Sequence, residues 1–318
     1  DSFIANLVDS GSIGDSGSIA INTGSLELIN GGQVNASNSG RGDAGAISII
    51  ALGNIIADGE SPINSSPSRI ISAVGADAEG NAGTVNISVN DLTIKNGARI
   101  ATIAGGQGNA GGINISTNNL SLLNGGVINN SNFGEGMGGV INITATENIT
   151  FDRANSNASL SGIFSQVSSG ATGDGGDINI SADNLTLRNG GTVSASTFGQ
   201  GNAGTIKVNA RNLIFDGQAR GFSSGILSEV GADALGNAGA IKISTNDLTL
   251  RNGGQVSSST LGEGNAGAIE IIATGNLTFD GESTNDSLSG VFSQVNPETK
   301  GNAGAIKIST NDLTLRNG

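Results

Sequence analysis

The sequence predicts an all-β protein in which residues 1–318 form a single right-handed parallel β-helix, or β-solenoid. Three observations predict this fold. The chain repeats from end to end in units of 28 residues and of 35–38 residues. Within each unit, apolar and polar residues alternate with the period of two that is typical of strands. Asn-Gly or Asp-Gly pairs, which favour tight turns, recur at one place in most units.

Each repeat begins at a glycine that is followed by two alternating apolar residues, as in Gly304-Ala305-Ile306-Lys307-Ile308. Successive landmark glycines are 28, 38, 28, 28, 37, 28, 35, 28 and 37 residues apart, so short and long units mostly alternate. The ten landmarks are Gly17, Gly45, Gly83, Gly111, Gly139, Gly176, Gly204, Gly239, Gly267 and Gly304. We expect each unit to form one coil of three short strands.

The first strand of each coil follows the landmark glycine. Positions two and four after that glycine are Ile or Val in every unit, so equivalent strands are expected to stack as a parallel sheet with these side chains inside. In the last three units these positions are Ile241, Ile243, Ile269, Ile271, Ile306 and Ile308. The right hand of the coil is expected from the general preference of parallel β connections. One outward row is predicted to read Lys207, Lys242, Glu270 and Lys307.

The second and third strands complete the coil. Leu248 and Leu250 represent the second strand of short units, and Leu277 and Phe279 that of long units. Val256 represents the third strand. The additional residues of long units fall between the second and third strands, and the three prolines lie in loops of long units. We expect the three strands to build three sheets around one dry core of Ile, Leu, Val and Phe.

An asparagine recurs two residues before many of the landmark glycines. Side chains at equivalent positions of neighbouring coils lie about 4.8 Å apart, so these amides are expected to hydrogen bond along the rod. Like charges at that spacing would repel, which favours amides over acids. The predicted ladder consists of Asn81, Asn109, Asn202, Asn237, Asn265 and Asn302.

The composition excludes several classes of chemistry. The chain has 53 Gly but no Cys, His, Trp or Tyr. It therefore has no disulfides, no Cys- or His-ligated metal and no Ser-His-Asp triad. The net charge of −13 argues against nucleic acid as a partner, and no apolar run is long enough to span a membrane. We predict no cofactor, with Ca²⁺ as the one ion to consider.

Four alternatives to a purely structural role depend on particular residues. A carbohydrate-active enzyme would use acids such as Asp58, Asp152, Asp216 and Asp280, but their recurrence at one repeat position favours a role in turns. A calcium-dependent matrix protein would use loop acids. Arg41-Gly42-Asp43 matches an integrin-type tripeptide, and the Ser- and Thr-rich third strands suggest an ice-binding array. The loop acids are Asp77, Glu79, Asp174, Asp177 and Asp233.

The units over residues 236–281, GNAGAIKISTNDLTLRNGGQVSSSTLGEGNAGAIEIIATGNLTFDG, resemble the repeats of cyanobacterial filamentous-haemagglutinin-like exoproteins. These are also described as S-layer-family or two-partner-secretion proteins. The resemblance extends from Gly17 to Gly304. It implies a long secreted β-helix at the cell surface, exported through a dedicated outer-membrane pore protein. It implies no particular binding residues, because the repeat defines a scaffold.

From these observations we expect a structural or adhesive module of a secreted cell-surface protein, and no enzyme. Because both ends lie within a unit, we expect an internal segment of a longer rod, and the coils of this segment should stack to about 50 Å. The expected partners are surface glycans or other surface and matrix proteins, together with end-to-end or lateral self-association.

Overall fold

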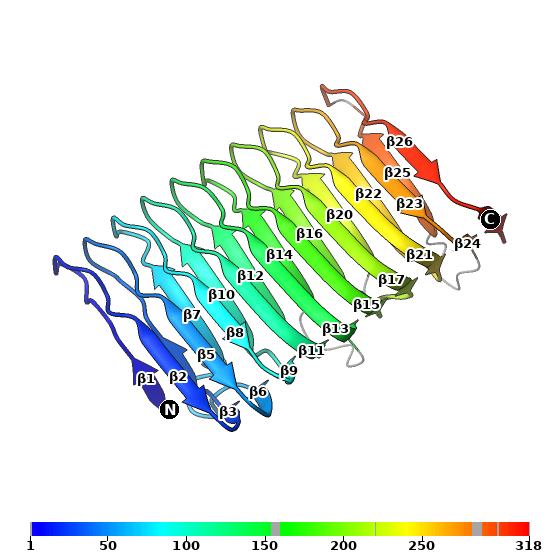
Figure 1. Ribbon diagram of the computed structural model, residues 1–318. Coiled ribbons are helices and arrows are strands. Elements are labelled where there is room, and N and C mark those ends of the chain that lie inside the picture. The colour runs from blue at the N-terminus through cyan, green and yellow to red at the C-terminus, as the bar shows by residue number, and fades with distance from the viewer. Residues whose placement is uncertain (1, 154–159, 220, 282–287, 298, 318) are drawn as a thin grey trace.

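The computed structural model describes residues 2–153, 160–219, 221–281, 288–297 and 299–317. In these residues it confirms an all-β fold built of parallel strands stacked in register, a parallel β-solenoid. Successive coils lie side by side from the N-terminal to the C-terminal end, as Figure 1 shows. In these residues no helix is present that is long and apolar enough to cross a membrane.

The third strands of the coils form a 10-stranded parallel sheet, here called the third-strand sheet. Its strands, in order, are β1 (Phe3–Ala5), β4 (Gln33–Asn35), β7 (Arg69–Val74), β10 (Arg99–Ala104), β12 (Val127–Asn132), β14 (Gly162–Val167), β16 (Thr192–Thr197), β20 (Gly225–Val230), β22 (Gln255–Thr260) and β25 (Gly290–Val295). This agrees with the predicted third strands.

The first and second strands belong to a single 15-stranded sheet, here called the first-strand sheet. The first strands are β2 (Ile19–Thr23), β5 (Ile47–Ala51), β8 (Val85–Ser88), β11 (Ile113–Leu123), β13 (Ile141–Asp152), β15 (Ile178–Arg188), β17 (Ile206–Asp216), β21 (Ile241–Arg251), β23 (Ile269–Ala273) and β26 (Ile306–Ser309). Separate second strands are β3 (Leu26–Ile29), β6 (Asn54–Asp58), β9 (Asp91–Lys95), β24 (Asn276–Asp280) and β27 (Asp312–Arg316).

The expectation of three separate strands and three sheets is therefore wrong for the middle coils. In β11, β13, β15, β17 and β21 the first and second strands are one continuous strand of 11 or 12 residues. The reason is that the corner between them keeps its ladder pairing, with only a register irregularity such as that between Thr117 and Asn119. A small antiparallel hairpin, β18 (Gln218–Ala219) and β19 (Phe222–Ser223), lies in one long coil.

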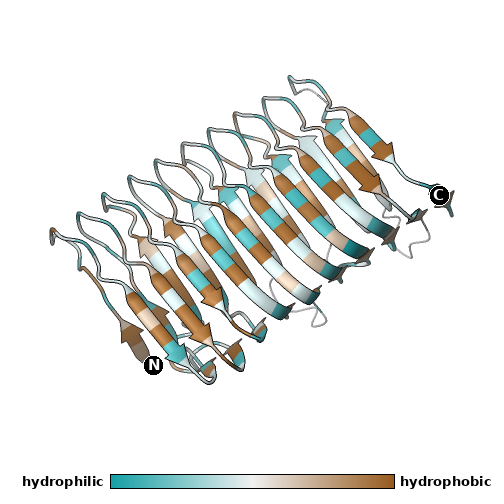
Figure 2. Cartoon of the chain, in the orientation of Figure 1, coloured by the Kyte–Doolittle hydropathy of each residue, from teal (hydrophilic) through white to brown (hydrophobic). Residues whose placement is uncertain are grey.

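Register follows the predicted apolar pattern. Ile241 pairs with Ile206 on one side and with Ile269 on the other, and Ile269 pairs with Ile306. The predicted ladder residues Ile241, Ile243, Ile269 and Ile271 are at most 1% exposed, whereas Ile306 of the last described coil is 44% exposed and Ile308 is partly buried. The alternation of apolar and polar bands along each strand is visible in Figure 2.

One continuous apolar core runs through the stacked coils. It contains the inward Ile, Leu and Val side chains together with Phe151 and Phe215, both fully buried. The core is not apolar throughout, however. A buried polar column lies along the inner face of the third-strand sheet, and Ser72, Ser228 and Ser258 belong to it. These hydroxyls accept hydrogen bonds from the backbone nitrogens of landmark glycines, such as Gly239 to Ser228 at 2.7 Å.

The landmark glycines are required by close approach between coils. From Gly45 onward, a methyl group on each landmark would overlap the carbonyl oxygen of the landmark one coil earlier. The predicted Asn-Gly corners instead depend on backbone conformation. Asn252 has φ of 53° and Gly253 has φ of 88°, as the two central residues of a tight hairpin-type turn require.

Candidate functional site

The predicted asparagine ladder forms a hydrogen-bonded row along one corner of the solenoid. The backbone nitrogen and the side-chain amide of Asn237 both donate to Oδ1 of Asn202, at 3.0 and 2.9 Å. Asn265 donates to Asn237 in the same way, and Asn302 donates to Asn265. Asn109 donates to Asn81. Each side chain thereby satisfies backbone and side-chain groups of the next coil.

This row also contains acids, which the repulsion argument did not predict. Asp43 accepts from the backbone nitrogen and amide of Asn81, and Asp174 accepts in the same way from Asn202. The backbone nitrogen of Asp43 donates in turn to Asp15. A carboxylate can occupy this position because the next coil donates a backbone N–H to it, whichever side chain the next coil carries there. Met137 occupies the position between Asn109 and Asp174.

Two further amide rows were missed by the sequence reasoning. The first lies on the outer face of the first-strand sheet and passes through Asn86, Asn114, Asn142 and Asn179, with amide hydrogen bonds of 2.9 Å. The second lies at the corner between first and second strands and passes through Asp91, Asn119, Asn148, Asn184 and Asn212. The first row could have been recognised from an asparagine that directly follows the first Ile or Val of a coil. The second could have been recognised from an asparagine that directly precedes the first apolar residue of the second strand.

The acids proposed for an enzyme are occupied by contacts with the next coil. Asp216 accepts from Arg251 at 2.7 Å and from the amide of Asn252 at 2.7 Å. Although burial alone would raise the pKa of Asp216, these two hydrogen bonds and the nearby arginines lower it. Asp58, Asp152 and Asp280 accept in the same way from Asn96, Asn189 and Asn317. All four acids therefore have a structural role, which is to join the corner of one coil to the corner of the next.

Glu229, on β20, is a carboxylate whose pKa is raised by burial. A glycosidase-type site needs two carboxylates about 5–10 Å apart. On β22 the residue in register with Glu229 is Ser259, and on β16 the hydroxyl of Ser196 accepts a hydrogen bond from the backbone nitrogen of Glu229 at 3.1 Å, so these contacts place no second acid beside it. The raised pKa therefore reflects loss of solvent rather than a carboxylate pair.

Glu229 gives a prediction about pH. A folded-state pKa above the unfolded value means that ionising the carboxyl costs stability as pH rises through this range. We expect Glu229→Gln to raise the unfolding temperature at pH 7 and to have little effect below pH 4.5, the ordinary value for Glu. Thermal unfolding followed by circular dichroism at both pH values checks this. Equal effects at both would show that Gln acts through packing instead.

The acidic loop residues do not assemble into a metal site in the described part of the chain. No three Asp or Glu side chains there lie close enough together to hold a metal ion. Glu79 forms an ion pair with Arg41 at 2.8 Å. Because Arg41 and Asp43 both contact the following coil, the Arg41-Gly42-Asp43 tripeptide is built into the corner ladder.

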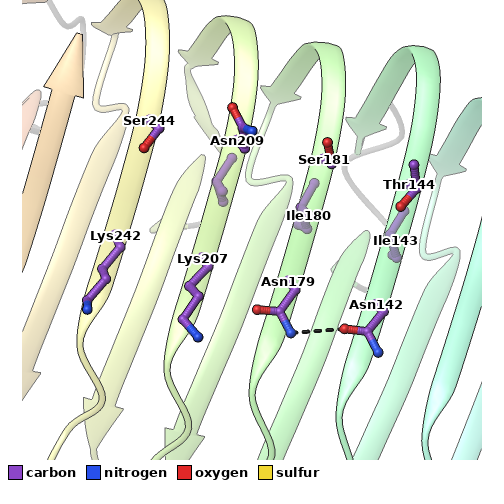
Figure 3. A pocket seen from close by; sticks show the side chains of 11 residues that line it. Asn142, Ile143, Thr144, Asn179, Ile180, Ser181, Lys207, Asn209, Lys242 and Ser244 are labelled. Atoms are coloured by element: carbon purple, nitrogen blue, oxygen red, sulfur yellow. Dashed lines mark hydrogen bonds between the residues drawn. The ribbon is translucent and has the colours of Figure 1, made fainter.

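A shallow hollow of about 430 Å³ lies on the outer face of the first-strand sheet, across β13, β15, β17 and β21. We call it the lysine groove. Figure 3 shows its two outward rows. In one row, Asn142 and Asn179 are followed by Lys207 and Lys242. In the other, which we call the hydroxyl row, the side chains are Thr144, Ser181, Asn209 and Ser244.

Lys207 and Lys242 are neighbours in register on β17 and β21, as predicted. Two positive charges one strand spacing apart, about 4.8 Å, repel by about 1 kcal/mol in water. The next residue of the row, Glu270, is in register with Lys242 and forms an ion pair with Lys307 at 2.8 Å. The hydrogen bond from Lys307, and to a smaller extent the charge of Lys242, lower the pKa of Glu270. Lys207 has no acidic neighbour in the row, because Asn179 lies on its other side. The groove is therefore a local concentration of positive charge.

A second hollow of about 410 Å³ continues the lysine groove along the same strands. The two share Ser181, Asn209 and Ser244. The continuation adds Arg211, whose guanidinium lies 4.0 Å from the carboxylate of Asp183, with both side chains more than half exposed. Such an exposed pair is weak, so the guanidinium remains accessible to a ligand.

Comparisons of the chain with models of protein families, with curated proteins and with solved structures give no match.

Proposed function

We propose that this chain is a structural and adhesive module of a secreted cell-surface protein, a rigid rod that presents repeated surfaces rather than one catalytic cleft. The observation that carries the proposal is the unbroken stack. Each coil pairs in register with the next in both sheets, and one core runs through the coils. The amide rows add hydrogen bonds along the same axis.

This architecture suits a scaffold for a physical reason. A solenoid exposes equivalent positions of successive coils at a constant spacing, so weak contacts with an extended partner add up along the rod. Secretion, a place at the cell surface and export through an outer-membrane pore protein belong to this proposal, and they are supported by the repeat resemblance alone. Lateral or end-to-end association of rods is compatible with it.

The proposal is tested in the source organism. We expect antibodies against the chain to label intact cells, and mild proteolysis of intact cells to remove the label. An in-frame deletion of the segment should reduce attachment of cells to surfaces without affecting growth. Labelling only after permeabilisation, or release of sugars from acidic polysaccharides by the purified chain, would contradict it. Unfolding that shifts on chelation would favour the calcium-dependent alternative.

A further inference from the structure

We infer that the lysine groove is a binding site for an acidic polysaccharide, whose carboxylate or sulfate groups lie between Lys207 and Lys242 while its hydroxyls contact the hydroxyl row. This inference rests on the proposed adhesive function and names the class of its partner. Three features of the groove support it: the charge of this face, the polar groups that the fold leaves unused, and the shape of the hollow.

The charge of this face is opposite to that of the whole chain. The two outward rows of the first-strand sheet, from β2 to β26, carry three lysines, Lys207, Lys242 and Lys307, and one acid, Glu270, which gives a net charge of +2. The whole chain carries −13. The outward residues of β2, β5, β8 and β11 in these rows are uncharged. A polyanion repelled by the acidic corners can therefore approach this face at its C-terminal half.

The groove contains polar groups that the fold does not use. The amide row ends at Asn179, which donates to Asn142, and Figure 3 shows its carbonyl oxygen directed toward the side of Lys207. The side chains of Ser181, Asn209 and Ser244 are exposed, and we find no hydrogen bond from them to other described residues. Within the amide rows, by contrast, successive side chains are joined from coil to coil, as between Asn148 and Asn184. Unpaired hydroxyls and amides beside two ammonium groups suit a ligand that has both hydroxyls and negative charges.

The shape indicates a chain rather than a single ion. The lysine groove crosses four strands, a length of about 14 Å at the usual strand spacing, and it continues into the hollow beside Arg211. It is open and shallow, so it does not enclose a small anion. Single-stranded nucleic acid is disfavoured because these rows contain no aromatic side chain on which bases would stack.

The test measures binding of the full 318-residue chain to polygalacturonate, to dextran sulfate and to neutral dextran by biolayer interferometry at low salt. We expect both acidic polymers to bind, neutral dextran not to bind, and added salt to weaken the complex. Stronger binding of polygalacturonate identifies carboxylates as the preferred groups, and stronger binding of dextran sulfate identifies sulfates. Lys207→Gln with Lys242→Gln should weaken binding about tenfold or more.

The matched control removes the same charge elsewhere. Lys95→Gln with Lys300→Gln lowers the net charge equally but leaves the groove intact, and we expect less than a twofold effect. Circular dichroism and thermal unfolding verify that both double variants fold. The inference is overturned if the chain binds neither acidic polymer, if both double variants weaken binding equally, or if single-stranded DNA of similar charge binds as tightly as the polysaccharides.

Failure of this inference is distinguishable from failure of the proposed function. If surface labelling and attachment depend on the segment but its Lys207→Gln, Lys242→Gln variant attaches normally, the adhesive role stands and the groove is not its binding site. If the purified chain binds acidic polysaccharides but is absent from the cell surface, the inference that the groove is a binding site is upheld and the proposed adhesive role is wrong.

Discussion

Replacing Gly204 by alanine is expected to destabilise the protein by about 3 kcal/mol, more than most single substitutions do. The added Cβ would overlap the carbonyl oxygen of Gly176 and would lie 2.5 Å from its carbonyl carbon. Both are backbone atoms of the preceding coil, so no side-chain rotation relieves the overlap. Neighbouring strands would have to separate locally, and their ladder hydrogen bonds would lengthen.

Gly24 is the matched control, because an added Cβ there meets no atom within 4 Å and its φ is not positive. We expect Gly24→Ala to be neutral or to stabilise by about 0.4–1 kcal/mol, since alanine restricts the unfolded chain. Urea unfolding monitored by circular dichroism compares the two midpoints. If both variants unfold at the same urea concentration, close approach between coils is not the reason for the landmark glycines.

The sequence was sufficient to predict this stack because the repeat constrains every coil in the same way. The spacing of the landmarks set the coil length, and the paired Ile and Val positions set the register that places Ile241 between Ile206 and Ile269. The outward row Lys207, Lys242, Glu270 and Lys307 followed from that register and is present in the structure.

Details that depend on the corners could not be predicted in this way. Whether first and second strands join depends on the backbone at residues such as Thr117 and Asn119, where the pairing continues through an irregularity. The buried hydroxyl of Ser228 resembles any other strand serine in the sequence. Only the folded coil shows that it faces inward and accepts from Gly239.

The lysine groove could likewise be predicted only in part from the sequence. The row of lysines could be read from the register, but the polar side chains beside it come from alternate positions of four different strands. The sequence pattern shows these as ordinary outward strand residues. What distinguishes them is their position in the folded stack, which places Ser181, Asn209 and Ser244 beside Lys207 and Lys242 in one hollow.

The second large effect is expected from the core. Phe215 is fully buried, and its neighbours in register are Leu187 on β15 and Leu250 on β21. Truncation by Phe215→Ala removes the ring from a column closed on both sides by adjacent coils. The backbone there is fixed by ladder hydrogen bonds, so the space collapses little, and we expect a loss of about 3–5 kcal/mol.

The same column provides its own control, because short coils already carry leucine where this long coil carries phenylalanine. Phe215→Leu should therefore lower the free energy of unfolding by less than about 1.5 kcal/mol. Leucine already occupies the equivalent position in the neighbouring short coils, and it refills much of the volume. Urea unfolding midpoints of Phe215→Ala and Phe215→Leu give the comparison. A similar loss in both variants would mean that the aromatic ring itself, rather than the filled volume between Leu187 and Leu250, holds these coils together.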